Sequence, residues 1–466
     1  MASAPADSRT ESVRRSGLRA DLLVGFLALG LVAAANLVIT WGHWYTFFRI
    51  FAWAPPLFAY WHPHVGPGTP LAVIVAVAVV ARGPGLAERL RWTRLVGLAY
   101  AAGLAWTFAV LLVDGWQRGI PSRIATGDEY LVDVPRVPDI PEFLRTFTSH
   151  ILSGRAGSWV THVSGHPPGA TLVFVWLDRV GLGGAPPAAL ACVLVGGLTV
   201  VAVPVTIRLL GNESAARAVV PFLVLLPGGA IAGVSADWLF AGVSSTGVAL
   251  LALGAVGLRA ARPRWPVRSV LICVSAGLVL GFCVFLSYGL VLFGLIPLAV
   301  LVAAGGLRAV LPAVVGVLAV VAIFTVAGFW WLDGYHLVIQ RYYQDLGATR
   351  PYDYWVWADL ACLVLICGPV FAAGLRRGAV LGFELVRERT WNRDVVVPLL
   401  TLAAVLAVAV ADESGLSKAE TERIWLPFAV WLVVSASLLP ARHRRWWLVG
   451  QVLVALVVKH LLWTQW

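Results

Sequence analysis

Residues 94–114 read RLVGLAYAAGLAWTFAVLLVD, an apolar stretch that begins at Arg94 and ends at Asp114. Residues 95–113 carry no charged side chain. An α-helix needs about 20 apolar residues to cross the hydrocarbon core of a bilayer. This stretch therefore predicts a membrane-spanning helix with a charged residue at each end.

The rest of the chain has the same character. Of its 466 residues, 59% are hydrophobic and only 13% are charged, whereas soluble domains carry about 25% charged residues. A bilayer must therefore solvate most of the chain, and we predict an all-α, polytopic bundle of about 13 transmembrane helices. Residues 1–20 are predicted to form a disordered cytoplasmic tail, and residues 21–466 a single transmembrane domain. Besides 94–113, the predicted spans lie near 22–40, 69–82, 186–207, 215–232, 235–259, 268–286, 287–304, 307–330, 356–374, 395–411, 424–440 and 447–463.

The distribution of arginine predicts the orientation. The chain is basic, with 35 Lys and Arg against 24 Asp and Glu, and the arginines gather in short loops. This pattern is typical of cytoplasmic loops of membrane proteins rather than of nucleic-acid binding. We therefore predict a multi-pass plasma-membrane protein with a cytoplasmic N-terminus. The basic segments predicted to be cytoplasmic are 82–94, 259–268, 376–393 and 442–445. The polar segments predicted to be extracytoplasmic are 114–167, 331–355 and 412–423.

Residues 168–182 are apolar, but they are few and include Asp178 and Arg179. A full crossing here would place Arg208 and Arg217 outside, against the positive-inside trend. We therefore expect a partial or re-entrant segment, which is tolerated where protein or a wet cavity covers it.

The longest polar segment, 114–167, is the predicted catalytic loop, because long loops are commonly functional. Residues 141–152 read PEFLRTFTSHIL, and the spacing of Phe143, Phe147 and Ile151 predicts a short amphipathic helix lying on the membrane surface. The acidic residues of this loop are Asp114, Asp128, Glu129, Asp133, Asp139 and Glu142.

Three of these acids are candidates for a general base. Asp114 lies where a spanning helix meets the loop, and partial burial there would raise its pKa toward that of a useful base. An ordinary solvated helix end is the alternative. Asp128 and Glu129 are the second candidates, and Asp133 and Asp139 are expected to be solvated.

Two histidines and a further carboxylate are predicted to contact substrate. His162 and His166, in the stretch THVSGHPPG, would bind a phosphate or a sugar hydroxyl, or orient a carboxylate. A structural role for His166 fits the sequence equally well. Asp237 falls near the outer end of a span, where a carboxylate is costly and therefore a functional candidate.

Two other outer segments supply cations and aromatic rings. Arginine suits phosphate, and tyrosine rings suit sugar faces or lipid head groups. An interfacial aromatic belt and salt bridges to Glu420 and Glu422 are the structural alternatives. The predicted donor-phosphate-binding residues are Arg341, Arg350, Lys418 and Arg423, and the predicted substrate-binding tyrosines are Tyr342 and Tyr352.

Together these residues resemble the GT-C superfamily of membrane glycosyltransferases, which use polyprenyl-phosphate sugars. The resemblance rests on an acid in the first long outer loop (Asp114 or the stretch 128–130), an amphipathic helix in that loop, and the stretch 166–168 (HPP) before the next membrane segment. A late outer loop with a basic residue before a proline, 422–427, completes it. Two helices precede the helix that leads into this loop, whereas in the superfamily the loop usually follows the first helix. This difference leaves the choice between Asp114 and Glu129 open.

The resemblance implies an inverting transfer in which Asp114 acts as base on the acceptor hydroxyl and Arg423 holds the donor phosphate. The Arg- and Ala-rich, Lys-poor composition is typical of actinobacteria, where such enzymes build envelope glycans that contain mannose and arabinose. The implied partners are a polyprenyl-phosphate sugar, a lipid or glycan acceptor, and membrane lipids, without nucleic acid. A transporter or flippase for a lipid-linked sugar is the alternative, although no internal repeat supports it.

No cofactor is required by this scheme. A divalent metal stays possible, but no acidic cluster has clear octahedral ligand spacing. The five cysteines all lie in apolar stretches without a CxxC spacing, so we expect neither disulfides nor a thiolate metal site.

Overall fold

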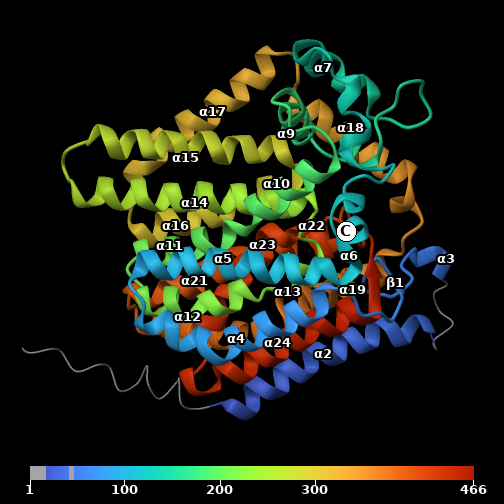
Figure 1. Ribbon diagram of the computed structural model, residues 1–466. Helices are drawn as coiled ribbons and strands as arrows, with labels where there is room; N and C mark the ends of the chain where they lie inside the picture. The colour runs from blue at the N-terminus through green and yellow to red at the C-terminus, as the bar shows by residue number, and fades with distance from the viewer. Residues whose placement is uncertain (1–16, 41–46) are drawn as a thin grey trace, which may run out of the picture.

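The computed structural model describes residues 17–40 and 47–466 (Figure 1). Their regular structure is almost entirely helical, which confirms the predicted all-α transmembrane bundle. Of the predicted tail 1–20, residues 1–16 lie outside the described residues, and the first helix already begins at Leu18. One small antiparallel sheet joins strands β1 (Ala59–Trp61) and β2 (Leu462–Thr464).

Within the described part of the chain, 9 helices are long and apolar enough to cross a membrane, or up to 10 if one bent pair counts as a span. The sequence predicted about 13. The difference comes from four predicted spans. Two of them form short apolar helices, at Tyr288–Ala304 and Leu426–Leu438, and a third, 356–374, is bent by 103° between α19 (Tyr352–Cys367) and α20 (Val370–Arg387). The fourth, 447–463, lies in the helix Ala441–Leu461, which is not among the 9. The 9 helices are Leu18–Ile39, Gly68–Arg89, Trp92–Gly119, Ala185–Leu209, Glu213–Ile231, Ala236–Ala260, Val267–Leu286, Leu307–Val326 and Arg393–Glu413.

Most of the long helices are single elements, and some spans consist of two. The elements of the first half are α2 (Leu18–Thr40), α3 (Phe47–Ile50), α4 (Gly68–Arg89), α5 (Trp92–Leu111), α6 (Gly115–Gly119), α7 (Ile140–Thr146), α8 (Thr161–Gly165), α9 (Pro168–Arg179), α10 (Ala185–Gly197), α11 (Thr199–Leu209), α12 (Glu213–Val224) and α13 (Pro227–Ile231). Those of the second half are α14 (Ala236–Ala260), α15 (Val267–Leu286), α16 (Leu295–Ala304), α17 (Val310–Val326), α18 (Trp331–Gln344), α21 (Val396–Glu413), α22 (Thr421–Ile424), α23 (Leu426–Leu432) and α24 (Ala441–Leu461). Short 3₁₀ turns connect many of them, including one at Leu112–Asp114.

The predicted partial segment 168–182 is a helix of 12 residues, α9. At about 1.5 Å per residue it is roughly 18 Å long, too short for a hydrocarbon core of about 30 Å. Two prolines precede and begin it, at positions 167 and 168, and a proline at the first position of a helix costs no hydrogen bond.

Two expectations about the outer segments are wrong. The apolar face of the short helix in 141–152 does not lie on a membrane surface, because Phe143, Phe147 and Ile151 are all buried in the protein. The Phe147 ring stacks on Trp159 and meets Phe329 edge-on. The segment 331–355 is not a loop either, since α18 occupies most of it.

Helices α4 and α24 connect the two ends of the bundle. Gly68, at the start of α4, packs so closely on α5 that an added Cβ would lie 2.1 Å from a backbone oxygen. Lys459, near the end of α24, contacts Asp114 just beyond α5. We call this the site end. Glu88 and Arg444 lie toward the other ends of the same two helices, roughly 22–30 Å away at about 1.5 Å per residue, at what we call the opposite end.

Candidate active site

The first cluster of polar residues at the site end surrounds Asp114. Its Oδ2 atom lies 2.5 Å from Nη2 of Arg123 and 2.5 Å from Nζ of Lys459, and its Oδ1 atom lies 2.7 Å from Nε2 of His64. The Asp114 side chain is only 2% exposed. Both carboxylate oxygens are thus occupied by cationic or imidazole partners, an arrangement suited to holding segments together rather than to accepting a proton from substrate.

This cluster is connected to a second one through Trp466. Arg123 donates from Nη1 to the Trp466 carbonyl oxygen at 3.4 Å. The Trp466 ring stacks on Phe58 and also lies 4.7 Å from the guanidinium carbon of Arg423. Its indole Nε1 donates to Oε1 of Glu422 at 3.2 Å. Contacts with the Asp114 cluster therefore help to place an aromatic ring against Arg423.

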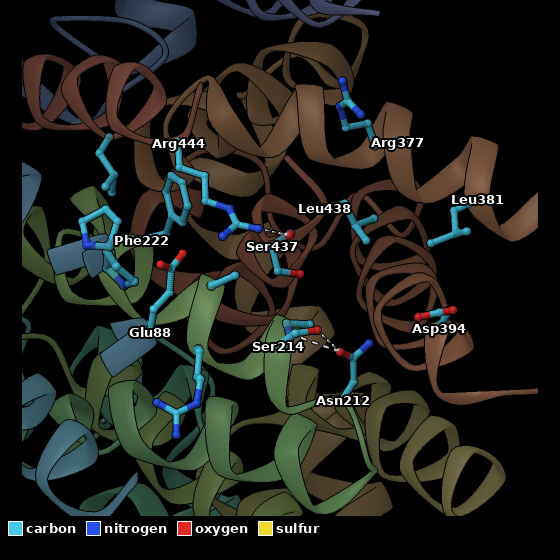
Figure 2. A pocket seen from close by; sticks show the side chains of 16 residues that line it. Glu88, Asn212, Ser214, Phe222, Arg377, Leu381, Asp394, Ser437, Leu438 and Arg444 are labelled. Atoms are coloured by element: carbon cyan, nitrogen blue, oxygen red, sulfur yellow. Dashed lines mark hydrogen bonds between the residues drawn. The ribbon is translucent and has the colours of Figure 1, made fainter. Parts of the chain in front are cut away.

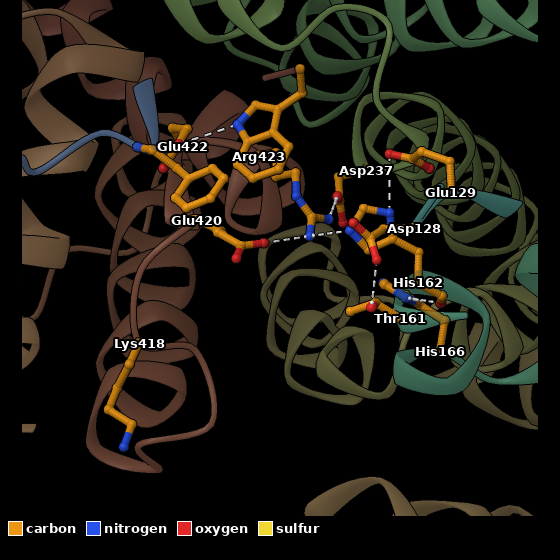
Figure 3. A network of polar contacts seen from close by, with 12 residues as sticks. Asp128, Glu129, Thr161, His162, His166, Asp237, Lys418, Glu420, Glu422 and Arg423 are labelled. Carbon is orange, nitrogen blue, oxygen red and sulfur yellow. Dashed lines mark hydrogen bonds and ion pairs between the residues drawn. The ribbon is translucent and has the colours of Figure 1, made fainter. Parts of the chain in front are cut away.

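Arg423, in α22, is the centre of the second cluster (Figure 3). It donates from Nη1 to Oδ2 of Asp237 at 2.7 Å, and from Nη2 to Oε2 of Glu420 at 2.8 Å and to Nε2 of His162 at 2.9 Å. Its Nε has no hydrogen-bond partner among the described residues. Such an unsatisfied buried donor is rare in proteins and calls for an explanation, such as a bound acceptor.

The contact between Arg423 and His162 determines the tautomer of the histidine. Arginine can only donate, so Nε2 of His162 must accept and carry no proton. The ring proton of this neutral imidazole is then on Nδ1, which lies 3.0 Å from Oε1 of Glu129 and donates to it. The loop residue Glu129, helices α8 and α22 and the start of α14 therefore converge in one hydrogen-bonded chain from Glu129 to Asp237.

The local backbone explains why these groups meet. Ser235 caps α14 by accepting from the Trp238 amide, which starts the helix two residues before Asp237. Ala419 and Glu420 both adopt positive φ angles, of 68° and 63°. Such conformations are strained for residues other than glycine and cluster at functional sites.

Burial and charge act against each other on the acids of the Arg423 cluster. Burial acts to raise the pKa of Glu129, but the hydrogen bond that it accepts from His162 and the charge of Arg423 lower it below its usual value. The same opposition, with Arg350 and Arg423 as the cations, leaves the pKa of Glu420 at about 2. Burial dominates at Glu422, where it raises the pKa to about 7, and at His166, where it lowers the pKa to about 4.

Asp128 lies at the edge of this cluster and is exposed. Its Oδ1 atom accepts from the Thr161 hydroxyl at 2.9 Å, and its carbonyl oxygen accepts from the His162 amide at 3.0 Å. The neighbouring Glu129 is only 6% exposed. Of the three predicted bases, Asp128 is therefore the one whose carboxylate is open to an acceptor.

The remaining predicted site residues have varied positions. His166 donates from Nδ1 to the His162 carbonyl oxygen at 2.8 Å and packs on Tyr130 and Phe240, which favours the structural role. The Tyr342 hydroxyl accepts from the Lys418 amide at 3.1 Å, whereas Tyr352 is 40% exposed and lies against Glu413. Asp133, expected to be solvated, is 1% exposed and pairs with Arg136.

The other three predicted phosphate-binding cations each have partners within the protein, and two of them lie outside the Arg423 cluster. Lys418 donates from Nζ to the Gly347 carbonyl at 2.6 Å. Arg341 pairs with Asp345 at 2.6 Å, outside the Arg423 cluster. Arg350 donates to the Lys418 carbonyl and, at 3.2 Å, to Glu420, so it touches the cluster through that carboxylate.

Four contributing residues were missed by the reasoning from sequence: Arg123, Lys459, Trp466 and Glu420, the last considered only as a local salt bridge. Lys459 carried a usable signal, because a charge inside the apolar run 447–463 is expensive and needs a partner. Nothing in the sequence indicated that Trp466 would reach Arg423. Within residues 17–40 and 47–466, no three His, Cys, Asp or Glu side chains are grouped so that they could hold a metal ion.

Comparison with known proteins finds no matching family model and no matching curated protein. Among solved structures, the chain is similar to the archaeal oligosaccharyltransferase AglB from Archaeoglobus fulgidus in complex with an inhibitory peptide and a dolichol-phosphate, with 11% identity over 75% of this chain and 50% of that chain and a TM-score of 0.41. A second structure, the Archaeoglobus fulgidus oligosaccharyltransferase in complex with Zn and sulfate, gives 14% identity, coverage of 84% and 51%, and a TM-score of 0.39. A third structure, ArnT from Cupriavidus metallidurans in the apo state, gives 13% identity over 66% of this chain and 72% of that chain, with a TM-score of 0.26. The chain spans about half the length of the two oligosaccharyltransferase chains, and TM-scores this low establish neither fold nor activity.

Proposed function

We propose that this protein is an inverting glycosyltransferase that moves a sugar from a polyprenyl-phosphate donor to a lipid or cell-envelope glycan acceptor on the extracytoplasmic side. The observation that carries the proposal is the buried Arg423, held by Asp237, Glu420 and His162, beside the exposed carboxylate of Asp128. A fixed cation and an open base within one cluster are what a transfer from a phosphate leaving group needs.

In this scheme Asp128 accepts the proton of the acceptor hydroxyl. The acceptor oxygen forms a bond to the anomeric carbon while the bond from that carbon to the phosphate oxygen breaks. The phosphate leaves with the electron pair, and Arg423 stabilises the negative charge that develops on it. The unpartnered Nε of Arg423 is the donor left for that phosphate.

Glu129 and His162 are positioning residues in the same scheme. Glu129 fixes the neutral tautomer of His162, and His162 accepts from Arg423. This assignment replaces Asp114 as first choice for the base, because the Asp114 carboxylate is buried and occupied by Lys459 and Arg123. Mannose or arabinose remains the proposed sugar, on the strength of the GT-C resemblance, and no cofactor is required.

The test uses the full chain in liposomes with radiolabelled polyprenyl-phosphate mannose or arabinose and a membrane lipid extract. Asp128→Asn should abolish sugar transfer while donor binding persists. Glu129→Gln should strongly reduce sugar transfer. Asp139→Asn is the matched control, since Asp139 is an exposed acid of the same loop that caps α7. Full transfer by both Asp128→Asn and Glu129→Gln would overturn the site.

A second outcome separates the alternative function. Donor binding without turnover by the unmodified protein, together with movement of the lipid-linked sugar between leaflets, would identify a flippase instead. Activity that survives EDTA would support a reaction without a divalent metal.

A further inference from the structure

A cavity of about 240 Å³ lies at the opposite end of the bundle, far from Arg423 (Figure 2). Its wall includes Glu88 near the end of α4 and Arg444 near the start of α24. Since these helices lead from there to the Asp114 cluster, roughly 22–30 Å separates the cavity from the site end. It is therefore a different place from the candidate active site.

Three arginines line this cavity, Arg217, Arg377 and Arg444, against the two carboxylates Glu88 and Asp394. Each guanidinium is held by the protein. Arg217 donates to Oε1 of Glu213 at 2.7 Å and to two backbone oxygens, and Arg377 donates to Oδ2 of the buried Asp21 at 2.6 Å.

Arg444 is fixed at the other side of the cavity. It donates to the carbonyl oxygens of Leu439 at 3.1 Å and Ser437 at 3.3 Å, the second of which Figure 2 shows. Guanidinium groups fixed in this way lose little freedom when an anion binds.

The start of α12 contributes a second feature that suits an anion. Asn212 and Ser214 line the cavity, and Asn212 caps the helix by accepting from the Ala215 amide at 3.1 Å. The α12 helix has 12 residues, so its first turn presents the positive end of a developed helix dipole.

An independent observation points to a bound group. The hydroxyl of Ser437 lines the same cavity, Ser437 is only 6% exposed, and its Oγ has no hydrogen-bond partner among the described residues. A buried hydroxyl without a hydrogen-bond partner carries a free-energy penalty. A ligand oxygen in the cavity would remove this penalty by accepting from the hydroxyl.

The rest of the wall is apolar and indicates what carries the anion. Side chains of four helices and a 3₁₀ segment form it: Pro84, Ala218, Pro221, Phe222, Leu381, Leu438 and Leu448. A free phosphate has no apolar atoms to bury against these side chains, and a nucleotide is largely polar. The glycerol and first acyl carbons of a lipid are apolar and gain free energy when they pack there. This end of the bundle also contains the basic segments that predict the cytoplasmic side, and anionic lipids enrich that leaflet.

We infer that this cavity binds the phosphate head group of an anionic glycerophospholipid from the leaflet at the opposite end. The phosphate contacts Arg444 and the start of α12, Ser437 donates to one of its oxygens, and the apolar wall covers the glycerol backbone. The lipid would join α4, α12, α20 and α24 as a structural ligand, independently of any transfer reaction.

The test measures lipid binding to the detergent-solubilised full chain by native mass spectrometry and by the shift in Tm. The probes are phosphatidylglycerol, phosphatidylcholine and inorganic phosphate. Arg444→Gln should weaken phosphatidylglycerol binding by about tenfold or more, as expected for loss of a charge-assisted hydrogen bond. Arg445→Gln is the matched control, because Arg445 is an exposed arginine of the same helix that does not line the cavity.

Selective binding of phosphatidylglycerol that Arg444→Gln loses and Arg445→Gln keeps would support the site. Equal binding by both variants, or equal binding of phosphatidylcholine, would identify only a lipid annulus and overturn it. Full competition by millimolar inorganic phosphate without any effect of the lipid tail would also overturn it in favour of a free-phosphate site. If Arg444→Gln does not fold, Ser437→Ala provides the same comparison, and unchanged lipid binding in that variant counts against the site.

Discussion

Nζ of Lys459 lies 2.5 Å from Oδ2 of Asp114, although 345 residues separate them in the chain. Both side chains are almost fully buried, at 1% and 2% exposed. This contact ties the end of α24 to the end of α5, and Arg123 shares the same carboxylate oxygen. A residue that looks like a catalytic base in sequence is therefore part of a buried ion cluster.

Neutralising Lys459 should destabilise the protein. Lys459→Met leaves Asp114 paired with Arg123 and His64 only, and breaking one partner of a buried ion pair typically costs about 3–5 kcal/mol. We expect a lower midpoint of thermal unfolding in detergent, while Lys459→Arg should lie between the variant and the unmodified protein. If Asp114→Asn abolished transfer without lowering the midpoint, the catalytic role of Asp114 would be restored.

Replacing Trp466 should affect donor binding more than turnover. The ring lies 4.7 Å from the Arg423 guanidinium carbon, and cation–π contacts contribute about 0.5–2 kcal/mol. Trp466→Leu should raise KM for the donor roughly fivefold with little change in kcat. Trp463→Leu is the control, since Trp463 lies three residues away in strand β2 but contacts Arg118 and Tyr60 instead. Equal effects of the two variants would show that Trp466 acts only on folding.

Glu422 should make stability depend on pH. Burial raises its pKa to about 7 in the folded protein, from an ordinary value of 4.5. Between these values the unfolded chain has lost the proton that the folded protein keeps, so the free energy of unfolding falls as pH rises from 4.5 to 7. The Glu422 contribution amounts to about 3 kcal/mol across this window. Unfolding followed from pH 4 to pH 8 should show this fall, and Glu422→Gln should remove it; an unchanged slope in Glu422→Gln would refute the assignment.

A pair of glycines in α4 tests the packing of the site end. At Gly68 an added Cβ would lie 2.1 Å from a backbone oxygen of α5, whereas at Gly85 it would meet nothing within 4 Å. Gly68→Ala should therefore destabilise the protein by about 1–3 kcal/mol, and Gly85→Ala should stabilise it by about 0.5–1 kcal/mol. Comparison of the two unfolding midpoints checks this, and a neutral Gly68→Ala would mean that α4 and α5 pack less closely.

The apolar runs predicted the helices well because a bilayer leaves little choice of structure. Runs such as 94–113 and 235–259 became single helices almost at the predicted boundaries. The bend between α19 and α20 was not predicted, since hydropathy records length and composition but not direction.

Several residues of the candidate site were named from the sequence, but the sequence did not show which of them would pair with which. Glu129, His162, Asp237 and Arg423 were all candidates, and the structure brings them together. The ion pairs of Asp114 were not predicted, because its partners Arg123 and Lys459 lie in other elements. Which charge meets which depends on packing between distant helices, and no local sequence pattern reports it.

The hydrogen-bonded chain from Glu129 to Asp237 also constrains how this protein can change over evolutionary time. Loss of Arg423 alone would remove the cation that pairs with Asp237 and would leave Glu420 with Arg350 as its remaining cation. Substitutions at these positions are therefore tolerated mainly as matched exchanges, in which a carboxylate and the guanidinium disappear together. Distant descendants of the same ancestor should show correlated substitution at positions 162, 237, 420 and 423, detectable in an alignment before any activity is assayed.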